Sequence, residues 1–321
     1  MRTARIRDDS QNNYYHLYNR ISGMPTDYEF GEKEKSKMLE ILSHLLLLHD
    51  IEMIDFCLMD NHWHMIVETK SINKPLSKEE VYNRYLAYYG EKKVKTINWK
   101  SKKVLKNLTD RIHDMSKFIG VFQQRFTKWF NNSKIETTGT ARRGSLWAGR
   151  YKSTLLQQGD ALILGMNYVD MNPVRAKICE EPADFPFSSV GLTAQGKNPF
   201  FTNMIKHIKN WYGEQAQHWN EKQVYAKYYS ELMRIVAAER GESSEQIFAI
   251  ADDAKKHPRI KLPITKHTNF WTNGAVLGTK QFIQRIAEKI KTDSKSKTKP
   301  FGKAENSNGL VFYSYRNVKN S

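Results

Sequence analysis

Hydrophobic and polar residues follow regular patterns through the first 190 residues and predict a series of short elements. Residues 14–21 are rich in aromatic side chains and roughly alternate until a Gly- and Pro-containing break at 22–25, which indicates a strand and a turn. Apolar residues then recur every three or four positions over 32–49, as on the buried face of a helix. Two hydrophobic runs, 51–58 and 63–68, are separated by turn-forming residues and predict a hairpin.

The next segment is polar and rich in lysine, and regular patterns return after it. Residues 71–106 predict an excursion from the core with a short helix at 78–89. An apolar stripe predicts one helix over 108–130, and a further helix is expected over 160–171, ending before an Asn-Pro pair. This order of elements is typical of the α+β class, with a ferredoxin-like, RRM-like antiparallel sheet and helices on one side.

The character of the chain changes after about residue 190. We therefore expect a first domain over 1–190 and a mainly helical accessory region over 191–321, with a helix at 211–237. Residues 230–250 weakly resemble a helix-turn-helix, which would suit DNA binding, and a packing role is the alternative. The segment 291–303 is basic and poor in apolar residues, so it is expected to be a flexible arm.

Charge points to an anionic partner. Lys and Arg number 51 against 34 Asp and Glu, which gives a formal net charge of +17. Such an excess suits neutralisation of phosphates, so nucleic acid is favoured over an anionic membrane surface. The two cysteines have no metal or disulfide spacing, and no signal peptide or membrane span is readable. These features favour a cytoplasmic protein.

The first candidate site is the pair of histidines in His62-Trp63-His64. Side chains at i and i+2 of a strand point the same way and start roughly 7 Å apart, so both imidazoles can converge on one cation. Trp63, Met65 and Val67 would take the opposite face and pack on helices. Taken alone, the two histidines are more simply explained as hydrogen-bonded residues of a sheet.

The second candidate site is Tyr168 with Asn172. On a helix these residues lie at i and i+4, so a phenol and an amide oxygen would face one place. A phenol has an ordinary pKa of about 10 and needs help to act as a nucleophile near neutrality. Taken alone, Tyr168 is more simply explained as a packed helix residue, and Asn172 as a helix cap before Pro173.

Four segments in order, however, resemble single-tyrosine HUH transposases, and in particular the REP-associated tyrosine transposases. Residues 59–68 (MDNHWHMIVE) resemble the family's Met-x-Asn-His-x-His signature, and 145–153 (SLWAGRYKS) its Leu-Trp-x-x-Arg-aromatic-Lys segment. Residues 168–176 (YVDMNPVRA) are similar to the family's tyrosine helix, and 182–189 (PADFPFSS) to the segment that closes its catalytic domain. The resemblance covers about residues 13–190.

The resemblance implies a chemistry and a set of roles. His62, His64 and Asn172 would bind Mg²⁺ or Mn²⁺, and Tyr168 would attack a phosphate of single-stranded or hairpin DNA to form a 5′-phosphotyrosine. No nucleotide cofactor is needed for cleavage or joining. Transposition and DNA recombination in association with the nucleoid would follow. Phosphate contacts would come from basic residues around this site. These are Arg142, Arg143, Arg150, Lys152 and Arg175.

Some positions depart from the family pattern, and some alternatives remain open. Asp60 stands where many members have proline, and the stretch 125–131 has Phe and Trp where members often have tyrosine. Tyr151 is the reserve candidate for the nucleophile. The alternative functions are a domesticated DNA-binding or regulatory protein without turnover and a hydrolytic metalloenzyme that acts on another phosphodiester. A monomer is expected, with a dimer as the alternative.

Overall fold

We describe the protein from a computed structural model, which places residues 6–23, 29–73, 76–133, 143–243, 245–246, 271, 275–293, 302–305 and 311–314. Within these residues the strands form one seven-stranded sheet in the order β2-β3-β1-β4-β5-β7-β6. The strands are β1 (Asn13–Arg20), β2 (Ile51–Leu58), β3 (His62–Thr69), β4 (Lys152–Leu156), β5 (Val276–Gly278), β6 (Gly302–Glu305) and β7 (Val311–Ser314).

The first four strands have the ferredoxin-like arrangement that the sequence predicts. Chain order is β1, α1 (Glu32–Leu48), β2, β3, α5 (Met115–Ser133) and β4, and all three neighbouring pairs among these strands are antiparallel. β5 then joins the edge strand β4 in parallel, so the complete sheet is mixed. The predicted α+β class is confirmed.

Helices cover both faces of the sheet, whereas the sequence predicts helices on one side. On one face, Trp63, Met65 and Val67 share a core with residues of α1 and α5, as expected. On the other face, Ile66 packs with α7 (Asp160–Asp170), α10 (Phe201–Tyr212) and α11 (Glu221–Glu239). The physical reason is that β3 carries apolar side chains on both faces, and each face needs cover from water.

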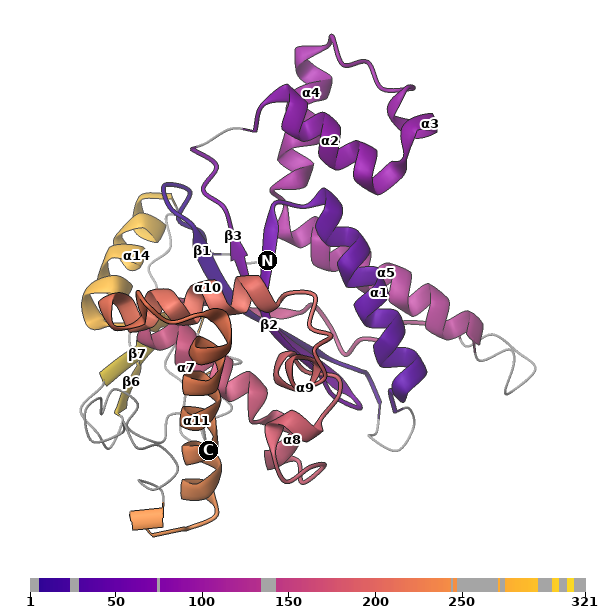
Figure 1. The fold of residues 1–321 in the computed structure, drawn as a ribbon. Coiled ribbons are helices and arrows are strands. Elements are labelled where there is room, and N and C mark those ends of the chain that lie inside the picture. Colours follow the sequence, from indigo (N-terminus) through magenta and orange to yellow (C-terminus); the bar gives the residue numbers. More distant parts are fainter. Residues whose placement is uncertain are drawn as a thin grey trace.

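The predicted excursion is a lobe of three helices that projects from the sheet (Figure 1). It contains α2 (Lys78–Tyr89), α3 (Glu91–Val94) and α4 (Lys102–Ile112). The single helix predicted over 108–130 is wrong, because α4 ends at Ile112 and α5 starts at Met115. Asp114 causes the break, since its Oδ1 accepts a hydrogen bond from the Lys117 N–H at 3.0 Å and so caps a new helix.

The part of the chain after residue 190 is mostly helical, as predicted, with the strands β5 to β7 in addition. Its other elements, with those that lead into it, are α8 (Asn172–Arg175), η1 (Pro182–Asp184), α9 (Ser189–Ala194), η2 (Gly213–Ala216) and α14 (Lys280–Asp293). The helix predicted over 211–237 is interrupted, because Gly213 has φ of 63° and Asn220 caps α11.

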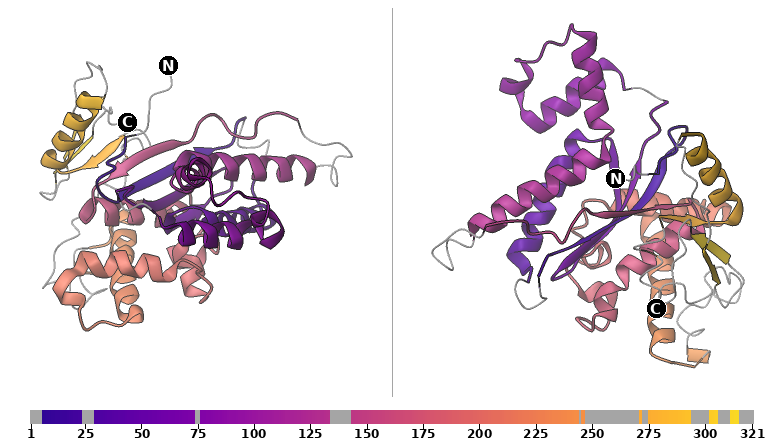
Figure 2. Two further views of the ribbon diagram at one scale, coloured as in Figure 1. Left: turned by 90° about the horizontal axis from the view of Figure 1, so that it is seen from above. Right: turned by 180° about the vertical axis from the view of Figure 1, so that it is seen from behind.

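Elements far apart in the chain lie at the two ends of the sheet. α14 with β6 and β7 sits at one end, away from α1 and α5 (Figure 2). Of the weak helix-turn-helix at 230–250, residues 230–239 are the end of α11, and residues 244 and 247–250 lie outside the described residues. Of the basic arm at 291–303, residues 291–293 belong to α14 and 302–303 to β6, and residues 294–301 lie outside the described residues. The domain boundary near residue 190 stays a prediction.

Candidate active site

The histidine pair of β3 lies on the face of the sheet that α7 covers. Strand alternation directs His62 and His64 to this face and Trp63 to the other, where Trp63 is fully buried. The rings of His62 and His64 have centroids 5.0 Å apart and planes at 90°. The two side chains therefore lie together at the start of the strand, as the spacing predicts.

A chain of hydrogen bonds fixes where the proton of His64 lies. The Trp271 carbonyl can only accept, so the His16 Nδ1 atom, 3.1 Å away, must donate to it. His16 is neutral because burial lowers its pKa to about 4, and its Nε2 atom therefore keeps a lone pair. His64 Nδ1 lies 2.9 Å from that lone pair and donates to it. The lone pair of His64 is consequently on Nε2.

The neighbouring residue Asn61 likewise places the proton of His62 on Nδ1. Its Nδ1 atom is 2.6 Å from Asn61 Oδ1, an acceptor, so Nδ1 carries the proton and Nε2 the lone pair. Burial lowers the pKa of His62 to about 4, and it lowers that of His64 well below the ordinary value, helped by the adjacent histidines. Both rings are therefore neutral near pH 7, the form that binds metals.

Tyr168 packs against the same histidines. It is 2% exposed, and its ring meets that of His64 edge to face with centroids 5.5 Å apart. Trp271 stacks on Tyr168 at 5.4 Å with planes 19° apart, and the Arg175 guanidinium lies 5.8 Å from the centre of the tyrosine ring. Burial raises the pKa of the Tyr168 phenol well above its ordinary value, and the positive charge of Arg175 opposes this.

Tyr151, the reserve candidate, lies elsewhere. Its ring belongs to the core on the opposite face of the sheet from the histidines, together with Trp63. Its hydroxyl donates to the Met115 carbonyl at 3.5 Å. Geometry thus brings Tyr168, and not Tyr151, to His64.

Asn172 caps the helix that carries Tyr168. Its Nδ2 atom donates to the carbonyls of Tyr168 at 2.8 Å and Val169 at 3.3 Å. Because an amide is planar with its two heteroatoms on opposite sides, this bond turns Oδ1 away from the end of the helix. Asn172 therefore does cap the end of this helix. Its role as a metal ligand stays a prediction.

The basic residues predicted to contact DNA differ in their surroundings. Arg175 is held by Glu239 of α11 through two bonds, Nη2 to Oε1 at 2.6 Å and Nε to Oε2 at 3.2 Å. Arg143, Arg150 and Lys152 are exposed. Arg142 lies outside the described residues.

Three residues of the site are not identified by the sequence analysis: His16, Tyr18 and Trp271. Tyr18 faces His64 across the β1–β3 pair and stacks on it at 4.9 Å, and burial raises the pKa of its phenol. The alternation of residues 14–21 does place His16 and Tyr18 on one face. The register that brings them to His64 is a long-range pairing without a local signal.

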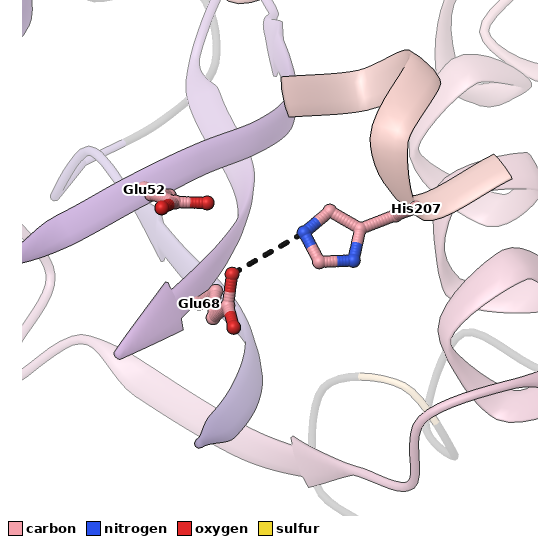
Figure 3. A group of neighbouring side chains, drawn as sticks. All are labelled: Glu52, Glu68 and His207. Carbon is pink, nitrogen blue, oxygen red and sulfur yellow. Dashed lines mark ion pairs between the residues drawn. The ribbon is translucent and has the colours of Figure 1, made fainter. Parts of the chain in front are cut away.

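A second polar cluster lies at the far end of β3, on the same face (Figure 3). Ligand atoms of Glu52, Glu68 and His207 lie within 4.8 Å of one another, so this group could hold a metal ion. Lys70 bonds both carboxylates, at 2.6 and 3.1 Å, and Lys206 also bridges them. Two ammonium groups thus neutralise two carboxylates, and a metal ion would have to displace them.

The described site and sheet define an α+β protein with two neutral histidines beside a buried tyrosine. A solved REP-associated tyrosine transposase with a bound REP hairpin is 12% identical to this chain, with 62% of this chain and 90% of that one covered and a TM-score of 0.39. No protein-family model and no curated protein matches the sequence. Likeness of this degree carries no argument about activity, so the case for a function comes from the residues themselves. In the described ranges, no helix is long and apolar enough to cross a membrane.

Proposed function

We propose that the protein is a metal-dependent endonuclease and strand transferase that acts on single-stranded, hairpin-forming DNA through Tyr168. The observation that carries the proposal is that two neighbouring, buried histidines each engage Nδ1 in a hydrogen bond. Hydrogen bonds at Nδ1 leave His62 and His64 with Nε2 lone pairs, and the Tyr168 ring packs 5.5 Å from His64. This packing supports our assignment of His64 as a metal ligand and of Tyr168 as the nucleophile.

The residues present fit a divalent cation. Neutral imidazoles with one nitrogen tied to a partner are the usual form of histidine ligands, and Asn61 and His16 are those partners here. We assign His62, His64 and the Oδ1 atom of Asn172 as the ligands of Mg²⁺ or Mn²⁺. When bound, such an ion polarises a phosphate oxygen and offsets charge that develops in the transition state.

The reaction requires no further cofactor. The Tyr168 oxygen forms a bond to phosphorus, the bond from phosphorus to the 3′-oxygen breaks, and the phenol proton ends on that oxygen. The products are a 5′-phosphotyrosine and a free 3′-hydroxyl, and attack by a 3′-hydroxyl reverses the step and joins strands. Because Tyr168 packs against His64 of the same chain, we propose that a monomer suffices.

Access to Tyr168 must change during this reaction. The ring is 2% exposed, with Trp271 stacked on it and Arg175 close by. We propose that Trp271, or the pair of Arg175 with Glu239, moves off the ring when a phosphate binds. Once Glu239 is released, Arg175 becomes a phosphate contact beside the nucleophile.

The deciding experiment is covalent trapping. The protein is incubated with labelled single-stranded hairpins and Mn²⁺ or Mg²⁺, and adducts are separated on denaturing gels and mapped by mass spectrometry. We expect an adduct on Tyr168 that requires metal and is lost in Tyr168→Phe. Tyr151→Phe is the matched control, because Tyr151 is a buried tyrosine on the other face of the sheet and its loss should leave the adduct unchanged.

A DNA-binding or regulatory protein without turnover is the second candidate, and the burial of Tyr168 favours it. It predicts tight hairpin binding with no adduct under either metal. A hydrolytic metalloenzyme predicts cleavage that survives Tyr168→Phe. Either result would refute the tyrosine mechanism.

A further inference from the structure

The helical lobe of residues 78–112 is inserted between β3 and α5. Its buried residues Val81, Tyr85 and Val94 belong to the core that α1 and α5 form on one face of the sheet. Trp99 packs edge to face on Tyr85 at 6.2 Å, and its Nε1 atom donates to the Val94 carbonyl at 3.0 Å. The lobe projects from the sheet (Figure 1), and its buried residues lie in a different core cluster from Tyr168. It therefore offers a surface that the proposed active site does not use.

This lobe carries a dense positive charge. Seven lysines lie between residues 92 and 106, and this stretch contains no Asp or Glu. All seven are exposed: Lys92, Lys93, Lys95, Lys100, Lys102, Lys103 and Lys106. We call this set the α3–α4 basic surface. Lys95 forms an ion pair with Glu91 at 3.2 Å, but these side chains are 76% and 75% exposed, and such pairs contribute little to stability.

The lysines of α4 also share one side of their helix. Lys102, Lys103 and Lys106 fall within about 100° of one another around the axis at 3.6 residues per turn. Leu105 and Leu108 pack against the main core instead. Apolar side chains are thus turned inward, whereas a helix that lies on a membrane needs them beside its lysines. This arrangement favours a polyanion in solution over a lipid surface.

We propose that the α3–α4 basic surface binds the phosphate backbone of a DNA duplex, the stem of a hairpin whose single-stranded part reaches the histidines. The inference rests on the proposed function and adds the place where the stem is held. Duplex DNA presents one negative charge per about 1.7 Å of axis, and lysine binds phosphate as a point charge without reading sequence. Charge complementarity carries the assignment.

The aromatic residues of the lobe argue against single-stranded DNA at this surface. Proteins that hold single strands stack bases on exposed aromatic rings. Here Tyr85 and Tyr88 are buried, and the Nε1 atom and ring of Trp99 are engaged within the lobe. Tyr82 is 38% exposed but meets Trp99 edge to face at 5.1 Å. The surface therefore supplies phosphate contacts and little stacking.

Salt dependence of binding tests the proposal in the full-length protein. Four lysines of the surface are changed to glutamine together: Lys93, Lys100, Lys102 and Lys103. The matched control changes four exposed lysines outside the lobe to glutamine: Lys177, Lys197, Lys222 and Lys280. Fluorescence anisotropy then measures affinity for a hairpin with a duplex stem of about 15 base pairs and for an unstructured single strand, from low to moderate salt.

Each lost phosphate contact should make the slope of log affinity against log salt less negative by about 0.9. If all four lysines contact the stem, the slope for the lobe variant should be less negative than the wild-type slope by up to about 3.6. The control should keep most of the wild-type slope. Adduct formation on Tyr168 with the single strand should be unchanged in both variants.

Equal slopes for the lobe variant and the wild-type protein on the stem would overturn the proposal. Equal losses in the lobe variant and the control would also overturn it, because binding would then be diffuse. Binding to vesicles of anionic lipid is measured as well. A lobe variant that loses vesicle binding but keeps its affinity for the stem would also overturn the proposal. The adduct is scored separately, so failure of the proposed chemistry would appear as absence of the adduct even where the slope changes as expected.

Discussion

Replacing His16 by Phe removes the acceptor that holds the proton of His64 on Nδ1. The His16 Nε2 atom lies 2.9 Å from His64 Nδ1, and both side chains are 1% exposed, so no water replaces the lost bond. His64 then gains freedom to carry its proton on Nε2, the atom that would bind the metal. Loss of such a partner typically weakens metal affinity 10- to 100-fold, which corresponds to about 1.4–2.8 kcal/mol.

Mn²⁺ titration followed by electron paramagnetic resonance measures this loss, and long-range ¹⁵N NMR reports the tautomer of His64 directly. His16→Gln is the matched control, because its carbonyl oxygen reaches the position of Nε2 and still accepts a hydrogen bond. We expect His16→Gln to retain most of the affinity and the Nδ1–H form. Unchanged affinity in a folded His16→Phe protein, or an Nε2–H tautomer in the wild type, would refute the reasoning.

Two further predictions concern contacts around the helix of Tyr168. Burial raises the pKa of Asp170 to about 7, and burial and Asp170 together raise that of Asp55 well above its ordinary value. Because the folded state holds protons more tightly than the unfolded state, stability should fall as pH rises from about 4 to 7, and Asp55→Asn should flatten this slope in urea unfolding. Arg175→Met and Glu239→Gln should each destabilise the protein. Their double-mutant cycle in thermal unfolding should give a coupling free energy of about 1–3 kcal/mol. Additive effects of the two substitutions would mean that the contact contributes nothing to stability.

Local patterns predict most elements that position the site. Strand alternation places His62 and His64 together and Trp63 opposite them, and both are found. The spacing of three and four residues predicts α1 almost to its ends, and composition with the Asn-Pro pair that follows does the same for α7. Such features depend on neighbours in sequence, so one segment of chain is enough to read them.

Contacts between distant segments are what the sequence does not reveal. Trp271, on which the tautomer of His64 depends, belongs to a part of the chain outside the motifs, and the partner of Arg175 is on α11. Its sequence neighbours alone predict that Asp60 is a neutral change in a turn. In the structure it forms an ion pair at 2.6 Å with Lys35, which is 6% exposed. Each of these pairings depends on the assembled fold.

The Trp271 carbonyl has a consequence for the timing of synthesis. A nascent chain that has made β1, β2 and β3 already contains His16 and His64, but the acceptor that orders the protons of this pair is still to be translated. At about 5–20 residues per second, the 200 or so residues that separate β3 from Trp271 take on the order of 10–40 s. During that interval His16 and His64 are present in the ribosome-bound chain without the carbonyl that orders their protons. The proposed metal ligand His64 would therefore gain its final tautomer only after Trp271 has been translated.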